Sequence, residues 1–413
     1  MDNPHIRSSS SRARGRGGGR GSTTTKRSHK KKKRDITDGL SAEPVTTLTV
    51  PLSTGKVAIR DPKCIGSYNW VDSPSPTILV PGSPRIWRNK PTPFTIRPDS
   101  GNHFCDQNGY RLPRTPLLPI LVAVDEMAAG ADAWSAIPID WPSVDFITDR
   151  NGLRKLLDWV GGTKQSFRIE LQLAGTKTVL CNRWEPKARL KVHGGYGYNF
   201  EDTMTHTAPG CERSSAGHHR IVTYDLAGLK MVVRCETDAC HPPRNVPSSS
   251  TGRQSAQRVS MAPLAKSTTS THAVDQGTFL TVIHAGKPVA TESVIELTTR
   301  KGSRDSTRKL KNKYQQLYFS QTPELIVGLH LNGRFTDLQR NTIESLAYFK
   351  DGVQGRLATL GQALRDIQDL VVKSGREGRL SLIGRDRDLL VFERSSAASC
   401  LPEIYLKRFV KSG

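Results

Sequence analysis

The sequence predicts an α/β fold, with a mixed, largely antiparallel sheet core and flanking helices, on three observations. Short runs that alternate apolar and polar residues flank Ala-Gly pairs, which is typical of β-hairpins. Other short runs are rich in Val and Ile, residues that favour strands. Two segments space their apolar residues three and four positions apart, which predicts helices with one buried face.

These patterns place each element in order along the chain. The predicted elements are a helix at 151–160, hairpins at 167–173 with 176–182 and at 221–226 with 229–236, strands at 279–283, 293–298 and 324–329, and a helix at about 341–373. Gly161 and Gly162 follow the first helix, and glycine commonly ends helices. In the last helix, apolar residues from Val353 to Val371 build a single face, which predicts core packing.

Two polar tracts interrupt this pattern. Residues 1–38 contain an Arg-Gly tract and a lysine cluster with almost no apolar residues, so we expect a disordered basic tail. Residues 242–277 are rich in Ser, Thr and Pro and predict a second disordered segment, inserted in the domain. The remaining sequence, 39–413, then predicts one domain with this insertion, because the motif residues described below lie on both sides of it.

The charge of the chain indicates a polyanionic partner. The formal net charge is +23 over 413 residues, and residues 1–34 hold 12 basic residues against one acidic residue. The rest of the chain is therefore basic as well, which favours nucleic acid or an acidic membrane surface. No apolar stretch approaches the roughly 20 residues that a membrane span needs, so we expect no membrane insertion. The run from Lys26 to Arg34 suits nuclear import.

Acidic residues in two predicted strands point to a metal site. Glu236 and Asp238 are two positions apart at the end of an apolar run, so their side chains project from the same face of a strand. Two adjacent carboxylates repel each other unless a cation lies between them. Glu296 lies inside the β-branched run 294–298, where a surface acid is unusual. Oxygen ligands of this kind suit Mg²⁺ or Mn²⁺.

The order of these and other motifs resembles the decapping exoribonucleases of the DXO type, over about 145–335. The resemblance rests on Asp145 to Arg150 with Lys155-Leu156-Leu157, Tyr196 to Glu201, the Glu236/Asp238 pair, Glu296, and Lys313 to Gln316 with Pro323 and Gly328. It implies a restriction-endonuclease-like nuclease core, in which an E-x-D strand is followed by a strand with E-x-K.

The resemblance also implies a function. It predicts metal-dependent hydrolysis of incomplete or non-standard caps at RNA 5′ ends, which 5′–3′ exoribonuclease activity can accompany, and a larger 5′–3′ exoribonuclease as partner. The implied metal ligands are Glu201, Glu236, Asp238, Glu296 and the Leu297 carbonyl, which would hold up to two Mg²⁺ or Mn²⁺ ions. Arg150 would hold a phosphate near the 5′ end, and Gln316 would position a ligand or water. The basic residues after the second acidic strand predict a sequence-independent RNA track; they include Lys301, Lys309 and Lys313.

One position departs from the family pattern. Thr298 stands where the family has a lysine that orients the attacking water and balances phosphate charge. Threonine can hydrogen-bond water but supplies no positive charge. Arg300 lies two residues further along the same strand face and offers a charge, although it is a poor base. Two hypotheses stay open: an active but slow hydrolase, and a catalytically weakened homologue that serves as an RNA-binding or scaffold protein.

Other kinds of site receive less support. The clusters Cys211/His218/His219 and Cys235/Cys240/His241 lack the paired spacing of structural zinc sites. The sequence has no glycine-rich phosphate loop, no serine-hydrolase elbow and no adjacent pair of aspartates, which disfavours a prenyl-diphosphate synthase.

Overall fold

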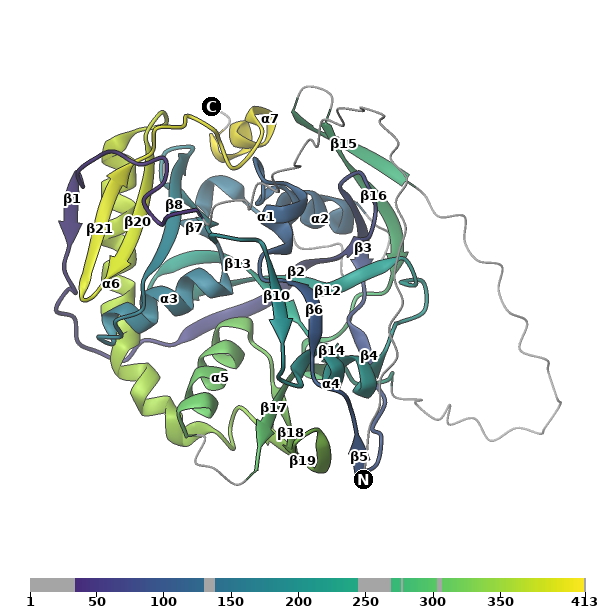
Figure 1. The fold of residues 1–413 in the computed structure, drawn as a ribbon. Coiled ribbons are helices and arrows are strands. Elements are labelled where there is room, and N and C mark those ends of the chain that lie inside the picture. The colour runs from purple at the N-terminus through teal and green to yellow at the C-terminus, as the bar shows by residue number, and fades with distance from the viewer. Residues whose placement is uncertain (1–33, 130–137, 244–268, 276–277, 303–306, 412–413) are drawn as a thin grey trace, which may run out of the picture. The chain divides into compact units, whose positions relative to one another are not determined.

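The structure is a computed structural model, and it describes residues 34–129, 138–243, 269–275, 278–302 and 307–411. Residues 34–413 form one compact unit. Of 214–216, 273–275, 278 and 307–309, only the backbone is described. Figure 1 shows the arrangement of the helices and strands.

Within the described residues, twelve strands form one mixed sheet (Figure 1). Their order across the sheet is β1 (Thr46–Leu48), β21 (Asp388–Glu393), β20 (Arg379–Arg385), β8 (Phe167–Ala174), β9 (Thr178–Arg183), β7 (Phe146–Asp149), β13 (Leu229–Thr237), β12 (Ser214–Leu226), β2 (Ile59–Val71), β3 (Thr77–Gly82), β16 (Thr278–Gly286) and β15 (Thr269–Asp275). Most neighbours are antiparallel, whereas β7 runs parallel to both β9 and β13, and β3 runs parallel to β16.

A second sheet and a two-stranded ribbon complete the β-structure of the described residues. The second sheet has the order β11 (Thr205–His206), β4 (Arg85–Trp87), β14 (Ala239–Cys240), β17 (Val294–Lys301), β18 (Glu324–Leu331), β19 (Arg334–Thr342) and β5 (Phe94–Thr95). The ribbon pairs β6 (Ser100–Phe104) with β10 (Arg189–His193) in antiparallel register. The α-helices are α1 (Gln107–Arg111), α2 (Leu118–Ala128), α3 (Arg150–Val160), α4 (Gly197–Met204), α5 (Thr307–Ser320), α6 (Lys350–Ser374) and α7 (Glu403–Leu406).

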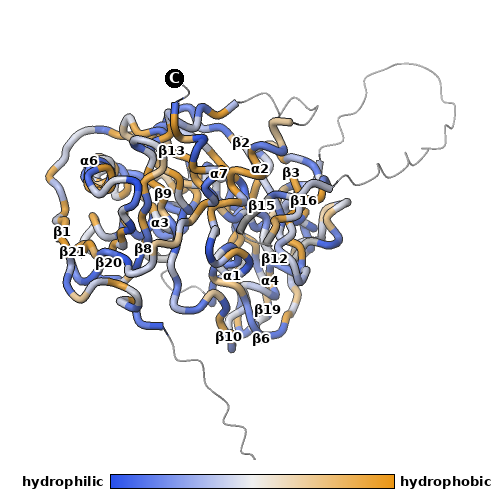
Figure 2. The backbone as a smooth tube through the Cα atoms, turned by 90° about the horizontal axis from the view of Figure 1, so that it is seen from above, coloured by the Kyte–Doolittle hydropathy of each residue, from blue (hydrophilic) through white to orange (hydrophobic). Residues whose placement is uncertain are grey.

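The alternation of strand residues gives the large sheet two cores. Phe146 and Val222 pack in one core with residues of α3, α5 and α6. Their neighbours Ile147 and Ile221 pack in a second core with residues of α2 and α7. Successive side chains of a strand point to opposite faces, so the two helix groups cover opposite faces of the sheet. In Figure 2 the hydrophobic stretches follow central strands such as β13 and β9.

The fold class that the sequence predicts is confirmed, as a mixed α/β structure with helices flanking its sheets. The predicted hairpins correspond to β8–β9 and β12–β13. Ala227 and Gly228 both have positive φ at the second hairpin, which suits the tight turn there. The long helix begins only at Lys350, because the preceding residues complete β19 and a short 3-10 turn.

The two tracts predicted to be disordered lie mostly outside the described residues. Part of the second tract differs from the prediction: Thr269–Asp275 forms β15, which pairs with β16. Ser270 and His272 on this strand both hydrogen-bond the Glu126 carboxylate, at 2.6 Å each. Tertiary contacts therefore stabilise a segment whose composition alone is polar. No helix of the described residues is long and apolar enough to cross a membrane.

Candidate functional site

The predicted E-x-D pair lies where the chain passes from the large sheet to the second sheet. β13 ends at Thr237 in the large sheet, and β14 begins at Ala239 in the second sheet. Asp238 is the link between them and is half-buried, whereas Glu236 is exposed as a residue although protein surrounds its carboxylate. The change of sheet thus fixes both carboxylates at the junction.

Glu296 comes to the same junction from β17 and is buried, with 3% of its surface exposed. It pairs in register with Leu325, which belongs to the core that α5 also joins. Its face of β17 is therefore the one that α5 covers. Its two carboxylate oxygens are both engaged: Oε2 accepts from Arg150 at 3.0 Å, and Oε1 accepts from Lys313 at 3.2 Å. Burial alone would raise the pKa of Glu296, but these two positive charges outweigh it and lower that pKa to about 2.

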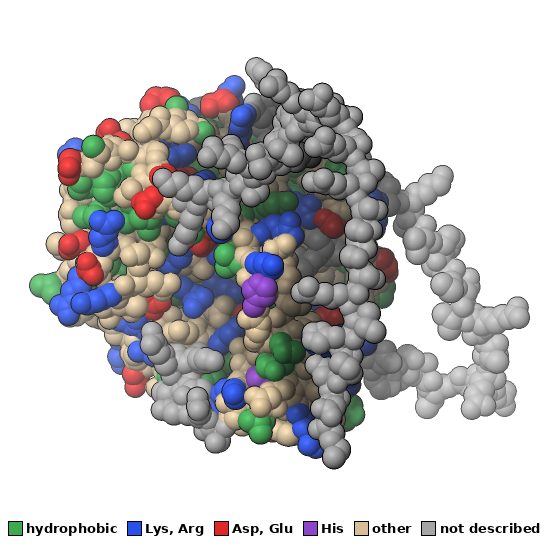
Figure 3. All heavy atoms as spheres, in the orientation of Figure 1, with side chains coloured by type: hydrophobic (Ala, Val, Ile, Leu, Met, Phe, Trp, Pro, Cys, Tyr) green, Lys and Arg blue, Asp and Glu red, His purple; other side chains and the backbone are tan. Residues whose placement is uncertain are grey.

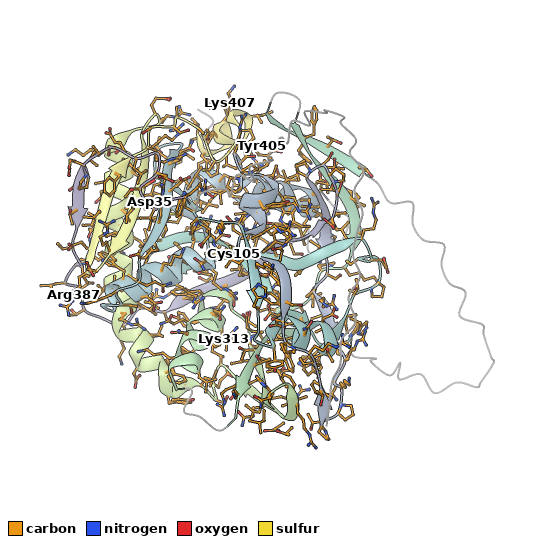
Figure 4. The ribbon with its side chains drawn as sticks, viewed as in Figure 1. Asp35, Cys105, Lys313, Arg387, Tyr405 and Lys407 are labelled. Atoms are coloured by element: carbon orange, nitrogen blue, oxygen red, sulfur yellow. The ribbon has the colours of Figure 1, made fainter. Side chains whose placement is uncertain are left out.

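Lys313, labelled in Figure 4, links this acid to the next residues of the site. Its Nζ also donates to the Leu297 carbonyl oxygen, at 3.4 Å. The Leu297 N–H in turn donates to Asp238 Oδ2, at 2.8 Å. The backbone of β17 therefore ties together an acid from β13–β14 and a lysine from α5.

Burial, and after it the charges of neighbouring acids, raise the pKa values of the other three acids. Burial raises the pKa of Glu201, on α4, well above its usual value, and the charges of Asp238 and Glu236 raise it further. Burial, followed by the charge of Glu296, raises the pKa of Asp238 to about 7. The surrounding protein also displaces water from Glu236 and raises its pKa. These residues, distant in the sequence, therefore share one electrostatic environment.

A buried ion pair supports the base of the site, and sequence reasoning missed it. Arg234, on β13, is 2% exposed and holds Asp149 with two hydrogen bonds, of 2.6 and 3.0 Å. It also donates to the Tyr68 hydroxyl at 3.2 Å and to the Pro116 carbonyl at 2.7 Å. Asp149 precedes Arg150 directly, so this network fixes the start of α3 and hence the arginine that holds Glu296.

Further basic residues lie near the acids, on α3 and at the end of β9, and Arg154 and Arg183 among them are not part of the motifs. Arg154 lies one helical turn after Arg150 on α3, and its pKa is lowered by burial and then by the nearby Arg150 charge. Arg183, at the end of β9, pairs with Glu185 at 2.8 Å, and Lys155 contacts the same carboxylate at 3.2 Å. The i+4 spacing from Arg150 is the sequence signal that points to Arg154.

The remaining predicted site residues fall in different places. Thr298 and Arg300 are half-buried on β17, and Lys301 is exposed at its end. Gln316 is half-buried on α5, three residues after Lys313 and hence on the same helix face. Lys313 contacts Glu296, and its part in an RNA track stays a prediction. The side chain of Lys309 lies outside the described residues.

The carboxylate oxygens of the four acids are suitable ligands for a divalent cation, but the side chains are not already arranged around a metal position. Within the described residues, no three His, Cys, Asp or Glu side chains form a ready-made metal group. Carboxylates whose pKa values rise through burial and then through neighbouring negative charges, as at Glu201 and Asp238, are groups that a bound hard cation would stabilise. Glu296 already forms ion pairs with Arg150 and Lys313. The fit is therefore best at Glu201, Glu236 and Asp238.

Comparison with known proteins gives a family and a fold. A family model described as "Domain of unknown function (DUF8563)" matches residues 46–409. No curated protein matches the sequence.

Among solved structures, the chain is similar to Rai1 proteins from three yeasts. S. pombe Rai1 has a TM-score of 0.55 at 12% identity, with 84% of this chain and 99% of that chain covered. Scheffersomyces stipitis Rai1 has a TM-score of 0.56 at 11% identity, with 88% and 97% covered. Candida albicans Rai1, in complex with pU5-Mn²⁺, has a TM-score of 0.55 at 12% identity, with 88% and 99% covered. The resemblance that the motifs predict is confirmed as a shared fold.

Proposed function

The chain belongs to the family described as a domain of unknown function, DUF8563, and on that premise we propose that it is a metal-dependent hydrolase of RNA 5′ ends. The substrates we propose are incomplete or non-standard caps, with 5′–3′ degradation of the exposed strand as an accompanying activity. Three facts support this proposal: the clustered acids, the net charge of +23 and the fold shared with a Rai1 that was solved with pU5-Mn²⁺.

We propose that Mg²⁺ or Mn²⁺ is held by Glu201, Glu236 and Asp238, with Glu296 and the Leu297 carbonyl beside it. Bound there, such an ion would lower the pKa of a bound water and would polarise a phosphoryl group. Arg150 keeps Glu296 ionised and in place through the 3.0 Å ion pair.

The phosphates of the strand need cations beyond Arg150 and Lys313, which both pair with Glu296. Arg154 meets this condition, because within the described residues it forms no ion pair with a carboxylate. We therefore assign Arg154, together with Arg183, to the phosphates of the strand, and Arg150 to holding Glu296. Gln316, on the face of α5 that carries Lys313, is placed to orient a ligand or water.

A single observation favours the enzyme over the scaffold hypothesis: Lys313 supplies a positive charge that Thr298 lacks. Its ammonium group lies 3.2 Å from Glu296 Oε1 and 3.4 Å from the Leu297 carbonyl oxygen. A lysine at position 298 would project from the same face of β17 as Glu296. Lys313 on α5 can therefore supply the positive charge that Thr298 does not supply on β17.

The direct test incubates purified protein with 5′-triphosphate, unmethylated-cap and NAD-capped RNAs, with and without Mg²⁺ or Mn²⁺, and identifies the products. We expect metal-dependent cleavage of at least one 5′ end, and its loss in Glu236→Gln. If none of these RNAs is cleaved but all are bound, the scaffold hypothesis replaces this proposal.

A charge swap tests the role of Lys313. Lys313→Met should lower kcat by about 10²–10³, the usual cost of losing one preorganised transition-state contact. Thr298→Lys should restore much of that loss in the Lys313→Met background, yet add little to the wild-type protein. Melting temperatures and Mn²⁺ affinity are measured in parallel, because a merely structural lysine would move those without changing kcat selectively. Unchanged turnover in Lys313→Met would remove the residue from the mechanism.

Location and protein partner extend the same proposal. We infer a nuclear location from the lysine-rich run 26–34 and, from the family resemblance, a larger 5′–3′ exoribonuclease as partner. A fluorescent fusion with and without residues 26–34 tests the first, and co-purification from nuclear extract tests the second. Cytoplasmic fluorescence of the intact fusion would contradict the import signal.

A further inference from the structure

The β6–β10 ribbon carries aromatic side chains that the proposed chemistry does not use. His103 on β6 lies opposite Leu190 on β10, and opposed residues of an antiparallel pair share a face. On that face the His103 ring stacks on Tyr198, with 3.7 Å between ring centroids and 16° between planes. Tyr198 is 41% exposed and Leu190 is 48% exposed. The stack is therefore open to solvent.

The chain holds this stack rigidly. The Asp99 carboxylate, directly before β6, accepts hydrogen bonds from the backbone N–H groups of Tyr198 at 3.3 Å and Asn199 at 2.9 Å. The Asp99 N–H donates to the Gly195 carbonyl, at 2.9 Å. These bonds fix the first turn of α4 against the ribbon. An aromatic pair held in this way needs little further ordering to receive a ligand.

The stack lies beside the acids. Tyr198 and Glu201 are three residues apart on α4 and so lie on neighbouring positions of one helix face. Burial and then the charges of Glu201 and Glu236 raise the pKa of Tyr198. These charges reach the tyrosine from two elements of the site, which places its ring at the edge of the acidic cluster.

The other face of the ribbon is basic and aromatic. Arg189 lies over the Phe104 ring at 5.1 Å and the Tyr110 ring at 5.5 Å, and Arg111 lies near the same two rings. Lys191, on the same strand, is exposed. Figure 3 shows Lys, Arg and His side chains on the surface over β10 and β6. A polyanion whose bases can stack matches this mixture of positive charge and exposed rings.

We propose that Tyr198 and His103 form a stacking site for a nucleobase of single-stranded RNA whose backbone enters the acidic cluster. This inference rests on the proposed function and adds to it the part of the substrate that the acids do not contact. Because every base has a π-face, stacking here holds the strand without selecting its sequence. Arg189 and Lys191 belong to the opposite face of the ribbon, where they add positive charge close to the bound strand.

Binding of abasic RNA tests this site. The probes are a fluorescently labelled single-stranded RNA and the same strand with abasic residues at its first two 5′ positions. Affinity is measured by anisotropy with the full-length protein in EDTA, so that cleavage does not interfere. Wild-type protein should bind the intact strand about 5-fold to 150-fold tighter, since each stacked base contributes roughly 1–3 kcal/mol. Tyr198→Ala should lose this preference, and Tyr198→Trp should keep it.

The controls separate stacking from general effects. Tyr348 is another exposed tyrosine, 64% exposed and outside the ribbon, so Tyr348→Ala should leave the preference unchanged. Equal binding of intact and abasic strands by wild-type protein would overturn the stacking site while leaving the proposed function standing. An equal loss of affinity for intact and abasic RNA in Tyr198→Ala would also overturn it, because the tyrosine would then only stabilise α4. If wild-type protein binds neither strand, in EDTA or with Ca²⁺ in its place, the proposed function fails, and this inference fails with it.

Discussion

Neutralising Asp238 should stabilise the metal-free protein, and the effect should depend on pH. Burial and the charge of Glu296 raise the pKa of Asp238 from 3.8 to about 7. The folded state therefore binds a proton more tightly than the unfolded state between these two values. Stability that is present below pH 4 is lost as the pH rises toward 7. Asp238→Asn removes the titration, and its side-chain oxygen can still accept the Leu297 N–H.

The size of the effect follows from the two pKa values. At 1.36 kcal/mol per pH unit, the change from 3.8 to about 7 corresponds to about 4 kcal/mol. Solvent reaches the half-buried carboxylate and Lys313 partly balances its charge, so we expect about 1–2 kcal/mol in practice. At pH 8 the free energy of unfolding of Asp238→Asn should be higher than that of the wild type by this amount. Near pH 4 the two free energies should be equal.

Urea unfolding in EDTA at pH 4 to 8 measures this difference. Asp388→Asn, at an exposed aspartate of the β20–β21 hairpin, controls for the loss of one negative charge. Adding Mn²⁺ at pH 8 should stabilise the wild type more than Asp238→Asn, because the ion relieves the same repulsion. A variant no more stable than wild type at pH 8, or a gap equally large at pH 4, would refute the reasoning.

Three further changes test the rest of the site. Arg234→Met should lower the free energy of unfolding by about 3–5 kcal/mol, measured in urea, because it leaves a buried carboxylate unpaired; a loss below 1 kcal/mol would contradict that. Gly217 has φ +98°, and a Cβ there would lie 3.0 Å from Glu236 Oε1, so Gly217→Ala should lower kcat. Gly55→Ala, at φ +119° with open space, shares the strain but should keep kcat. Deleting residues 1–34 should flatten the salt dependence of RNA binding without changing the preferred 5′ end; an unaltered slope would show that the tail does not bind RNA.

Local spacing explains why the sequence predicted the acids. Glu236 and Asp238 are two residues apart at a strand end, a spacing that predicts neighbouring side chains, and the structure places Asp238 just past that end. Glu296 stood out because an acid inside a β-branched run needs a buried partner. Each of these inferences uses a few consecutive residues, the range over which backbone periodicity is reliable.

The role of Lys313 and that of Arg234 depend on packing between distant elements. Lys313 reaches Glu296 only because α5 covers the face of β17 that carries that acid. Arg234 reads in the sequence as a polar residue inside an apolar strand, and its partner Asp149 lies 85 positions away. Periodicity gives the face of a strand but not the element that will cover it, so neither contact could be predicted.

The family pattern has a lysine on the strand at position 298, whereas this chain has Lys313 on α5. The two positions differ in which substitutions elsewhere in the protein would displace the positive charge. A lysine on β17 would have its position fixed by backbone hydrogen bonds to β18. Lys313 instead depends on how α5 packs, through neighbours such as Tyr314 and Leu317, which lie in the main core. A packing change in that core can then shift the ammonium group without touching any acid. Charge at the site is therefore coupled to the core of the large sheet, and an enzyme of this design would lose activity through core substitutions that a strand lysine would survive.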